Sequence, residues 1–227
     1  MTQGRSTKLA RSVQVFNNDD SVAFQERRNI NGLAYELLIH AVAPEINRRS
    51  GLEFEHPVRI LDVGCGSGPW IEAILKHADP SLPLRVKGID PAQRLIDSAW
   101  QRLKQYPNVE LESCSFQDLA SPQSFDLIYF VDVIQHFDKR DYEPIFSKSH
   151  DLLAKGGTIV IIDKEKYSIY SLKMLVKRKL YNLPSYYHTA EYPSFRVLRR
   201  LGFKQGLVLD NQFRKSQFAC LIMSKQT

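Results

Sequence analysis

The stretch at 60–68, ILDVGCGSG, constrains the fold more than any other part of the chain. The apolar run Val58–Val63 contains only one Arg and one Asp, which is typical of a strand buried in a parallel sheet. The residues after the stretch read as a helix with Pro69 in its first turn. Between strand and helix stand three glycines at alternate positions, Gly64, Gly66 and Gly68. Because glycine has no Cβ, a ligand can approach this turn closely and face the helix N-terminus.

Strand and helix patterns alternate after this turn. We expect further strands at 84–89, 109–114, 125–131 and 158–163, with helices at 69–78, after Pro91 and at 142–153. This alternation predicts an α/β fold with a parallel sheet and helices on both faces. Later elements are expected to be a helix at 169–180, an aromatic loop at 182–193, a helix at 193–202 and strands at 203–210 and 216–223 joined by a turn at 211–215. The last two strands predict a hairpin.

The N-terminal region is expected to be a helical cap over residues 1–50. Its first twenty residues are polar, and we expect them to be loosely held. From Ser21 onward apolar residues recur at three- and four-residue steps, which predicts a helix that ends at Pro44 or in the stretch 48–51.

Cysteine usage and hydropathy exclude several classes of protein. The three cysteines, Cys65, Cys114 and Cys220, form no CxxC pair, which argues against a disulfide framework and a structural zinc site. The N-terminal stretch lacks the apolar core of a signal peptide, and no apolar run approaches the ~18 residues of a membrane span. We therefore expect a cytoplasmic chain without a transmembrane segment.

The basic excess of the chain is confined to one segment. The formal net charge is +6, but residues 164–204 carry +8 and the remainder −2. Basic residues mixed with aromatic ones can bind phosphates and stack bases, or contact an anionic membrane surface. The same residues can also form an ordinary solvated face.

The glycine spacing distinguishes two classes of ligand. Dinucleotide-binding folds use GxGxxG, whose third glycine would fall at Pro69, a residue without the N–H that helps to hold a pyrophosphate. The spacing GxGxG, with Asp62 two residues ahead, resembles motif I of the class I S-adenosylmethionine-dependent methyltransferases. Asp90, the stretch FDLIYFVDVIQHF and the turn Gly156-Gly157 follow in the order that this family has. The resemblance covers residues 56–163 and 193–224.

The resemblance implies a seven-stranded, mostly parallel Rossmann-like sheet with helices on both faces and an antiparallel C-terminal strand. It implies a single methyltransferase domain over 1–227, in which 1–50 is an N-terminal cap and 164–192 is a basic aromatic insertion that covers the substrate. The implied cofactor is S-adenosyl-L-methionine, and the product is S-adenosyl-L-homocysteine.

The resemblance also implies which residues hold the cofactor. They are Asp62, Gly64, Cys65, Gly66, Gly68, Asp90, Pro91, Ser115, Phe116, Phe130 and Val131. Asp90 would accept hydrogen bonds from both ribose hydroxyls, because a carboxylate offers two acceptor oxygens. Ser115 stands where the family often has an Asp that contacts the adenine amino group. Cys65 is interpreted as a filler of the turn and not as a nucleophile.

Methyl transfer needs alignment of the acceptor and, in some enzymes, removal of its proton. Asp132 and His136, four residues apart, can share one face of a helical turn, and His188 is a third candidate base. A packing role for His136 and a capping or solvated role for Asp132 stay open. Gln135 stands where related metal-using enzymes carry Glu, so no metal is expected.

The acceptor is expected to contact residues outside the shared core. Candidates are Arg28 and Tyr35 in the N-terminal cap and Tyr186 and Tyr187 in the aromatic loop. The leading hypothesis is methylation of an O or N atom of a small molecule, as in specialised metabolism. The alternatives are methylation of RNA or protein through residues 164–204, and a cofactor-binding scaffold without activity. The chain is expected to be a monomer or a homodimer.

Overall fold

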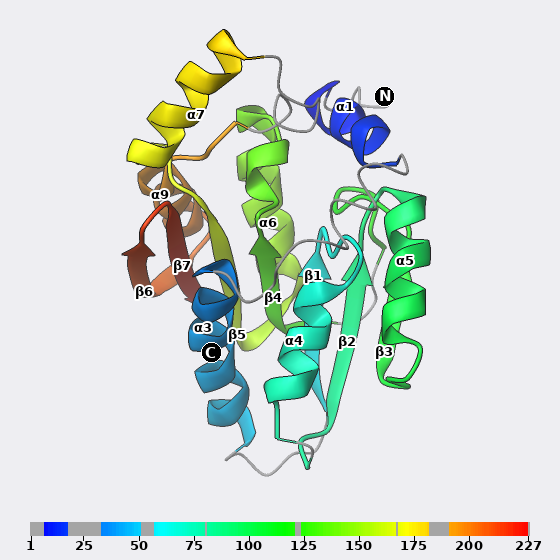
Figure 1. Cartoon of the computed structure of the whole chain (residues 1–227). Coiled ribbons are helices and arrows are strands. Elements are labelled where there is room, and N and C mark those ends of the chain that lie inside the picture. Colours follow the sequence, from blue (N-terminus) through cyan, green and yellow to red (C-terminus); the bar gives the residue numbers. More distant parts are fainter. Residues whose placement is uncertain are drawn as a thin grey trace.

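A seven-stranded sheet forms the centre of the protein (Figure 1). The structure is a computed structural model that describes residues 7–17, 33–50, 57–79, 81–120, 124–166, 168–181 and 191–226. The strands are β1 (Val58–Val63), β2 (Leu84–Ile89), β3 (Val109–Glu112), β4 (Phe125–Val131), β5 (Leu153–Lys164), β6 (Leu207–Lys215) and β7 (Phe218–Lys225). Their order in the sheet is β3-β2-β1-β4-β5-β7-β6. Only β7 runs antiparallel, pairing with β5 and β6, so the expected fold class is confirmed.

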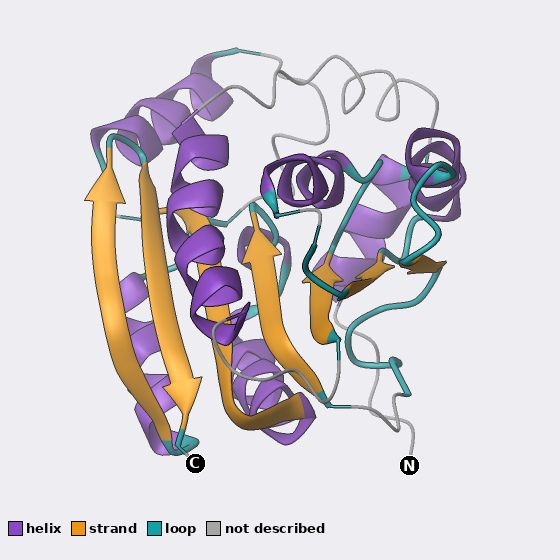
Figure 2. Ribbon diagram, turned by 90° about the horizontal axis from the view of Figure 1, so that it is seen from below, coloured by secondary structure: helices purple, strands orange, loops and turns teal. Residues whose placement is uncertain are grey.

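Helices cover both faces of this sheet (Figure 2). The helices are α1 (Thr7–Phe16), α3 (Leu33–Ser50), α4 (Pro69–His77), α5 (Gln93–Leu103), α6 (Tyr142–Leu152), α7 (Ile169–Leu180) and α9 (Phe195–Lys204). Two short 3-10 turns, η1 (Ile134–His136) and η2 (Lys139–Asp141), follow β4. Helices α3, α4 and α5 pack on one face, and α6 and α9 pack on the other. None of the described helices is both long and apolar enough to cross a membrane.

The packing of helices on both faces of the sheet explains why the sequences of the central strands β1 and β4 are largely continuous apolar runs. In β4, Leu127 and Tyr129 belong to the core under α3 and α4, while Ile128 and Phe130 belong to the core under α6 and α9. Successive side chains of a strand point to opposite faces, so burial of both faces requires apolar residues at every position. The strand predictions at 58–63 and 125–131 were correct for this reason, and the one at 84–89 was correct although Arg85 is exposed.

Pro44 does not end a helix, contrary to one of the two expected boundaries. It lies inside α3, which continues to Ser50, within the other expected boundary. Proline inside a helix removes a hydrogen bond and costs about 3 kcal/mol or more. Buried residues on both sides of it, among them Leu38, Val42 and Ile46, anchor α3 in the core, so burial outweighs this cost.

The C-terminal hairpin turns later than expected. Residues 211–215, predicted as the turn, pair with β7 as part of β6. The chain reverses at Ser216, whose φ of 57° lies in the left-handed region. A polar composition alone therefore misled the prediction, because β6 is an edge strand whose polar residues are exposed to solvent.

A close approach of α4 to β2 beneath the glycine turn generates a test. A Cβ added at Gly88 would lie 2.7 Å from Ile71 Cδ1 of α4 and 2.9 Å from Leu111 Cδ2 of β3. We expect Gly88→Ala to lower the unfolding free energy by about 1–3 kcal/mol in urea titrations, because the packed core cannot expand freely. In an Ile71→Val background, which lacks the nearest carbon, the same substitution should cost measurably less. Equal costs in the two backgrounds would contradict this packing account.

Candidate active site

The glycine turn connects β1 to α4 and is hydrogen-bonded to the carboxyl end of β2. Gly64 N–H and Cys65 N–H both donate to the Ile89 carbonyl, at 2.8 and 3.0 Å. Gly64, Gly66 and Gly68 have φ of 72°, 56° and 79°, values that favour glycine. A Cβ at Gly64 would also lie 2.6 Å from Val133 Cγ2. This turn therefore needs glycine for its conformation, and at Gly64 for space as well.

The Asp90 carboxylate connects this turn to the next one. Its Oδ2 accepts a hydrogen bond from Gly66 N–H at 3.0 Å, and its Oδ1 accepts one from Ala92 N–H at 2.8 Å. Burial raises the pKa of Asp90 to about 6, although both backbone donors act in the opposite direction. A buried carboxylate is thus held in a fixed orientation at the carboxyl ends of β1 and β2.

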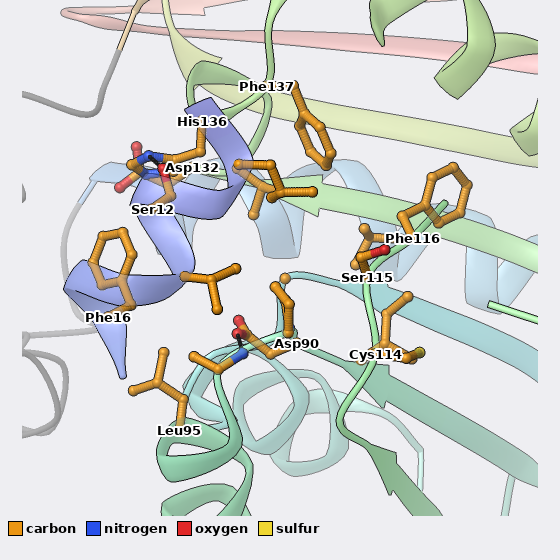
Figure 3. A pocket seen from close by; sticks show the side chains of 18 of the residues that line it. Ser12, Phe16, Asp90, Leu95, Cys114, Ser115, Phe116, Asp132, His136 and Phe137 are labelled. Carbon is orange, nitrogen blue, oxygen red and sulfur yellow. Dashed lines mark hydrogen bonds between the residues drawn. The ribbon is translucent and has the colours of Figure 1, made fainter. Parts of the chain in front are cut away.

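A pocket opens beside Asp90 at this edge of the sheet (Figure 3). Eight residues expected at the site line it: Gly64, Asp90, Pro91, Ser115, Phe116, Val131, Asp132 and His136. Apolar side chains that were not expected there, including Trp70, Leu95 and Phe137, complete the walls. The Ser115 hydroxyl donates to Asp118 Oδ2 at 2.7 Å, and the ring of Phe116 packs edge-on against Phe130 at 5.3 Å.

Five other expected residues support the pocket from behind and do not line it. They are Asp62, Cys65, Gly66, Gly68 and Phe130. Gly68 is the N-cap of α4, and Phe130 is fully buried in the sheet. The Cys65 thiol is buried, and burial raises its pKa well above the ordinary value, which fits a filler of the turn.

Asp62 is the least satisfied polar group behind the pocket. It stands beside Tyr129 in the β1–β4 register, and neither its carboxyl oxygens nor the Tyr129 hydroxyl has a hydrogen-bond partner of good geometry in the described part of the chain. Burial raises the pKa of Asp62 well above its usual range. Buried polar groups are normally hydrogen-bonded, so this pair marks a place where a ligand or a water molecule would be favourable.

Helix α1 closes one side of the pocket, which the expectation of a loosely held N-terminal stretch did not foresee. Leu9, Val13 and Phe16 recur at four- and three-residue steps and line the pocket together with Ser12. This spacing was visible in the sequence and is the signal that could have identified the helix.

Contacts at both ends hold α1 across the pocket. Lys8 Nζ donates to the Phe137 carbonyl at 2.9 Å, while Asn17 Oδ1 accepts from Arg94 N–H at the start of α5, at 3.0 Å. In between, Ser12 Oγ lies 3.5 Å from His136 Nδ1, and the Phe16 ring packs edge-on against the His136 ring at 5.2 Å.

A cluster of polar groups lies where β4 and β5 end. Asp132, with φ of 62°, accepts hydrogen bonds through Oδ1 from Gln135 Nε2 at 2.7 Å and from Lys164 Nζ. Asp163 is buried next to this pair and accepts from the backbone N–H groups of Gln135 and Lys164. Burial and the Asp132 charge raise the pKa of Asp163 to about 7, and Lys164 acts against them. Asp132 therefore faces the pocket as an already engaged carboxylate.

Several expected acceptor residues cannot be placed in the pocket. Arg28, Tyr186, Tyr187 and His188 lie outside the described residues. The Tyr35 hydroxyl lies 3.0 Å from His77 Nε2 on α4, and Tyr35 is not among the residues that line the pocket. Within the described ranges, no three His, Cys, Asp or Glu side chains gather in a way that could hold a metal ion.

Comparison with known proteins finds a methyltransferase domain in the central part of the chain. Residues 60–157 match a family model described as a methyltransferase domain. These residues begin in β1 and end in β5, so they include the glycine turn, Asp90 and the polar cluster after β4. The match covers less than half of the chain, and together with this topology it supports a methyltransferase domain of the class I S-adenosylmethionine-dependent type.

The relatives differ widely in what they are named for. The chain is 26% identical over 183 residues to a tRNA U34 carboxymethyltransferase of Alteromonas mediterranea, covering 74% of this chain and 50% of that protein. It is 24% identical over 149 residues to a ubiquinone biosynthesis O-methyltransferase of Pelagibacter ubique, covering 65% and 59%. The chain thus spans about half the length of these relatives.

A solved structure shares the fold. The magnesium protoporphyrin IX methyltransferase from Synechocystis PCC 6803, solved with bound SAH, superimposes with a TM-score of 0.71 at 14% identity, covering 96% of this chain and 100% of that one. At this identity the similarity supports the fold alone.

The raised pKa of Asp90 generates a stability test. Its value of about 6 in the folded state exceeds the 3.8 of an unperturbed Asp, so the folded state binds this proton more tightly and Asp90 lowers stability as pH rises from about 4 to about 6. We expect Asp90→Asn to gain on the wild type by up to about 3 kcal/mol in unfolding free energy across that range. Urea titrations at several pH values measure the difference. A similar gain in Asp97→Asn, an exposed position on α5, would rule out burial as its cause.

Proposed function

We propose that this protein binds S-adenosyl-L-methionine and transfers its methyl group to an O or N atom of a small molecule. The observation that carries the proposal is the pocket in which a buried acid, a glycine turn and the helix α1 meet. A ribose diol needs a fixed acceptor, and Asp90 is fixed by two backbone donors while its side chain lines the pocket. Helix α1 covers this pocket, which suits a small ligand better than a long polymer.

Other groups around the pocket suit the remaining parts of the cofactor. Leu95, Cys114 and Phe116 form an apolar wall next to Asp90, which suits the adenine ring. Gly64 leaves its backbone open to the methionine part, and Asp62 behind it offers carboxyl oxygens that lack partners among the described residues. These residues fit the cofactor through shape, apolar surface and acceptor groups.

The residues after β4 are assigned to the methyl acceptor. When bound, the cofactor supplies a methyl group on a positively charged sulfur, and the reaction is a displacement at that carbon. Asp132 is engaged by Lys164 and Gln135, so it is poorly suited to take a proton and serves to orient the polar end of the acceptor. The His136 ring, positioned by Ser12 and Phe16, takes the proton of the acceptor.

The relatives support two acceptor classes unequally. One relative is named as a ubiquinone biosynthesis O-methyltransferase, and the apolar walls of the pocket favour a small ring compound here. The tRNA U34 relative and the basic segment 164–204 support RNA as the second candidate. The two candidates differ in salt dependence, because phosphate contacts release counterions on binding.

The cofactor assignment predicts a loss of affinity on removing one carboxylate. We expect Asp90→Ala to weaken S-adenosylhomocysteine binding by about 1.5–3 kcal/mol, the range for a hydrogen bond to a charged group. Isothermal titration calorimetry measures it, with Asp97→Ala on the exposed face of α5 as the matched control. Absence of binding heat in the wild type would contradict the whole cofactor assignment. Unchanged affinity in Asp90→Ala would remove only Asp90 from the ribose role.

The assignment of His136 predicts a selective loss of turnover. Once a ring compound from an acceptor screen releases S-adenosylhomocysteine, we expect His136→Asn to lower kcat by about 100-fold or more, the usual contribution of a general base. Its calorimetric affinity for S-adenosylhomocysteine should stay close to that of the wild type. An unchanged kcat would leave His136 a packing residue.

Turnover on a small acceptor should vary little with salt, whereas RNA binding should fall by orders of magnitude between about 50 and 200 mM salt.

A further inference from the structure

Helix α7 carries a stripe of exposed aliphatic side chains. Its members, which we call the α7 stripe, are Ile169, Leu172, Val176 and Leu180, exposed by 77%, 63%, 47% and 70%. Steps of three and four residues place them on one face of the helix. Of the ten large apolar residues exposed in the described part of the chain, six lie on α7 or directly after it. Single exposed apolar residues are common, but such a concentration on one helix marks an interaction surface for another protein, a membrane or a ligand.

The opposite face of α7 holds the helix on the protein. Met174 is buried, and the buried Ser171 donates through its hydroxyl to the Glu165 carbonyl at 2.5 Å. The Ser168 hydroxyl caps the helix by accepting from Ser171 N–H at 3.1 Å. The helix is therefore seated by its own cap and by its inner face, and the α7 stripe contributes little to the core.

Positive charge borders the α7 stripe. Exposed Lys173 and Lys177 each follow a member of the stripe by one position, and the helix sequence IYSLKMLVKRKL contains no acidic residue. The acids nearest along the chain are already engaged: Glu165 is buried and paired with Arg214 at 3.1 Å, and Glu191 is paired with Lys8 and Lys139. The outer surface of α7 thus combines aliphatic side chains with cationic ones.

An apolar groove lies along one side of α7. Ile169, Leu172 and Leu175 line it on the helix, and Tyr192 lines it on the other side. The Tyr192 ring centroid is 6.0 Å from Lys164 Nζ, and Lys164 pairs with Asp132 of the pocket. Helices α7 and α1 also lie at the same end of the molecule, toward which β4 points (Figure 1). A surface that met α7 would therefore lie near the pocket.

We propose that α7 docks on the surface of an anionic lipid bilayer, with the α7 stripe in the boundary between headgroups and acyl chains. Lys173 and Lys177 would then contact lipid phosphates, the arrangement typical of interfacial amphipathic helices. A second copy of this chain is disfavoured, because a self-complementary contact would bring two basic helices together. Nucleic acid is disfavoured because bases stack on aromatic rings, whereas this stripe is aliphatic.

Vesicle sedimentation of the full chain tests the proposal. We expect binding to vesicles that contain phosphatidylglycerol and much weaker binding to vesicles of phosphatidylcholine alone. Lys173→Gln/Lys177→Gln should lower the partition coefficient by about 25-fold, since each lysine near an anionic surface contributes about fivefold. Leu172→Gln/Val176→Gln should lower it by on the order of 50-fold by removing aliphatic surface. Val197→Gln/Phe203→Gln on α9, at 47% and 50% exposed, is the matched control in the same basic segment and should bind like the wild type.

The outcomes separate this proposal from the others. Binding that is unchanged in both α7 variants, or that is lost equally in the α9 control, would overturn it. The proposal would also be overturned if the wild type did not bind vesicles and light scattering showed that it is a dimer, which Leu172→Gln/Val176→Gln dissociates. Circular dichroism melting curves like that of the wild type establish that the variants fold. Vesicle binding requires neither cofactor nor acceptor, so it stands or fails independently of the proposed methyl transfer.

Discussion

The carboxylate of Asp90 is the group on which the candidate active site depends. One oxygen holds the turn after β1 through Gly66 N–H, and the other holds the turn after β2 through Ala92 N–H. A single buried anion therefore sets the relative position of two turns, and α4 and α5 begin directly after them. Burial opposes the charge, which the raised pKa reflects, but no neutral side chain of that length offers two equivalent acceptors. The site keeps an electrostatic cost in exchange for a fixed geometry.

Most of the sheet could be predicted from the sequence, because strands buried on both faces produce unbroken apolar runs that local composition reveals. The pocket residues next to those strands, such as Gly64 and Asp90, were expected for a different reason, the glycine spacing and its resemblance to a known motif. Two of the failures, the placement of α1 and the end of α3, involve contacts with partners distant in sequence. Helix α1 is held by the Phe137 carbonyl and Arg94, and Pro44 is tolerated because the core on both sides of it is buried. Neither set of contacts is visible in the local sequence.

The charge of the chain also acquires a structural meaning. Acidic groups gather at the carboxyl ends of the parallel strands, where Asp90, Asp132 and Asp163 lie close to the pocket. Lys173 and Lys177 of α7 and Arg196 and Arg200 of α9 lie outside this centre, on exposed surface. Opposite charges are thus separated into an interior that suits a cationic ligand and an exterior that suits an anionic surface. The formal net charge of +6 is the sum of these two regions and describes neither of them alone.

The place of β7 between β5 and β6 bears on how the chain folds. In the sheet β5 lies between β4 and β7, so its second edge has no partner strand until residues 218–225 have been synthesised. That edge belongs to a strand whose residues Ile159–Ile162 are almost completely buried in the finished protein. An open, apolar strand edge can pair with other chains, and non-local pairing forms slowly. The insertion of β7 therefore removes a strand edge that other chains could otherwise pair with.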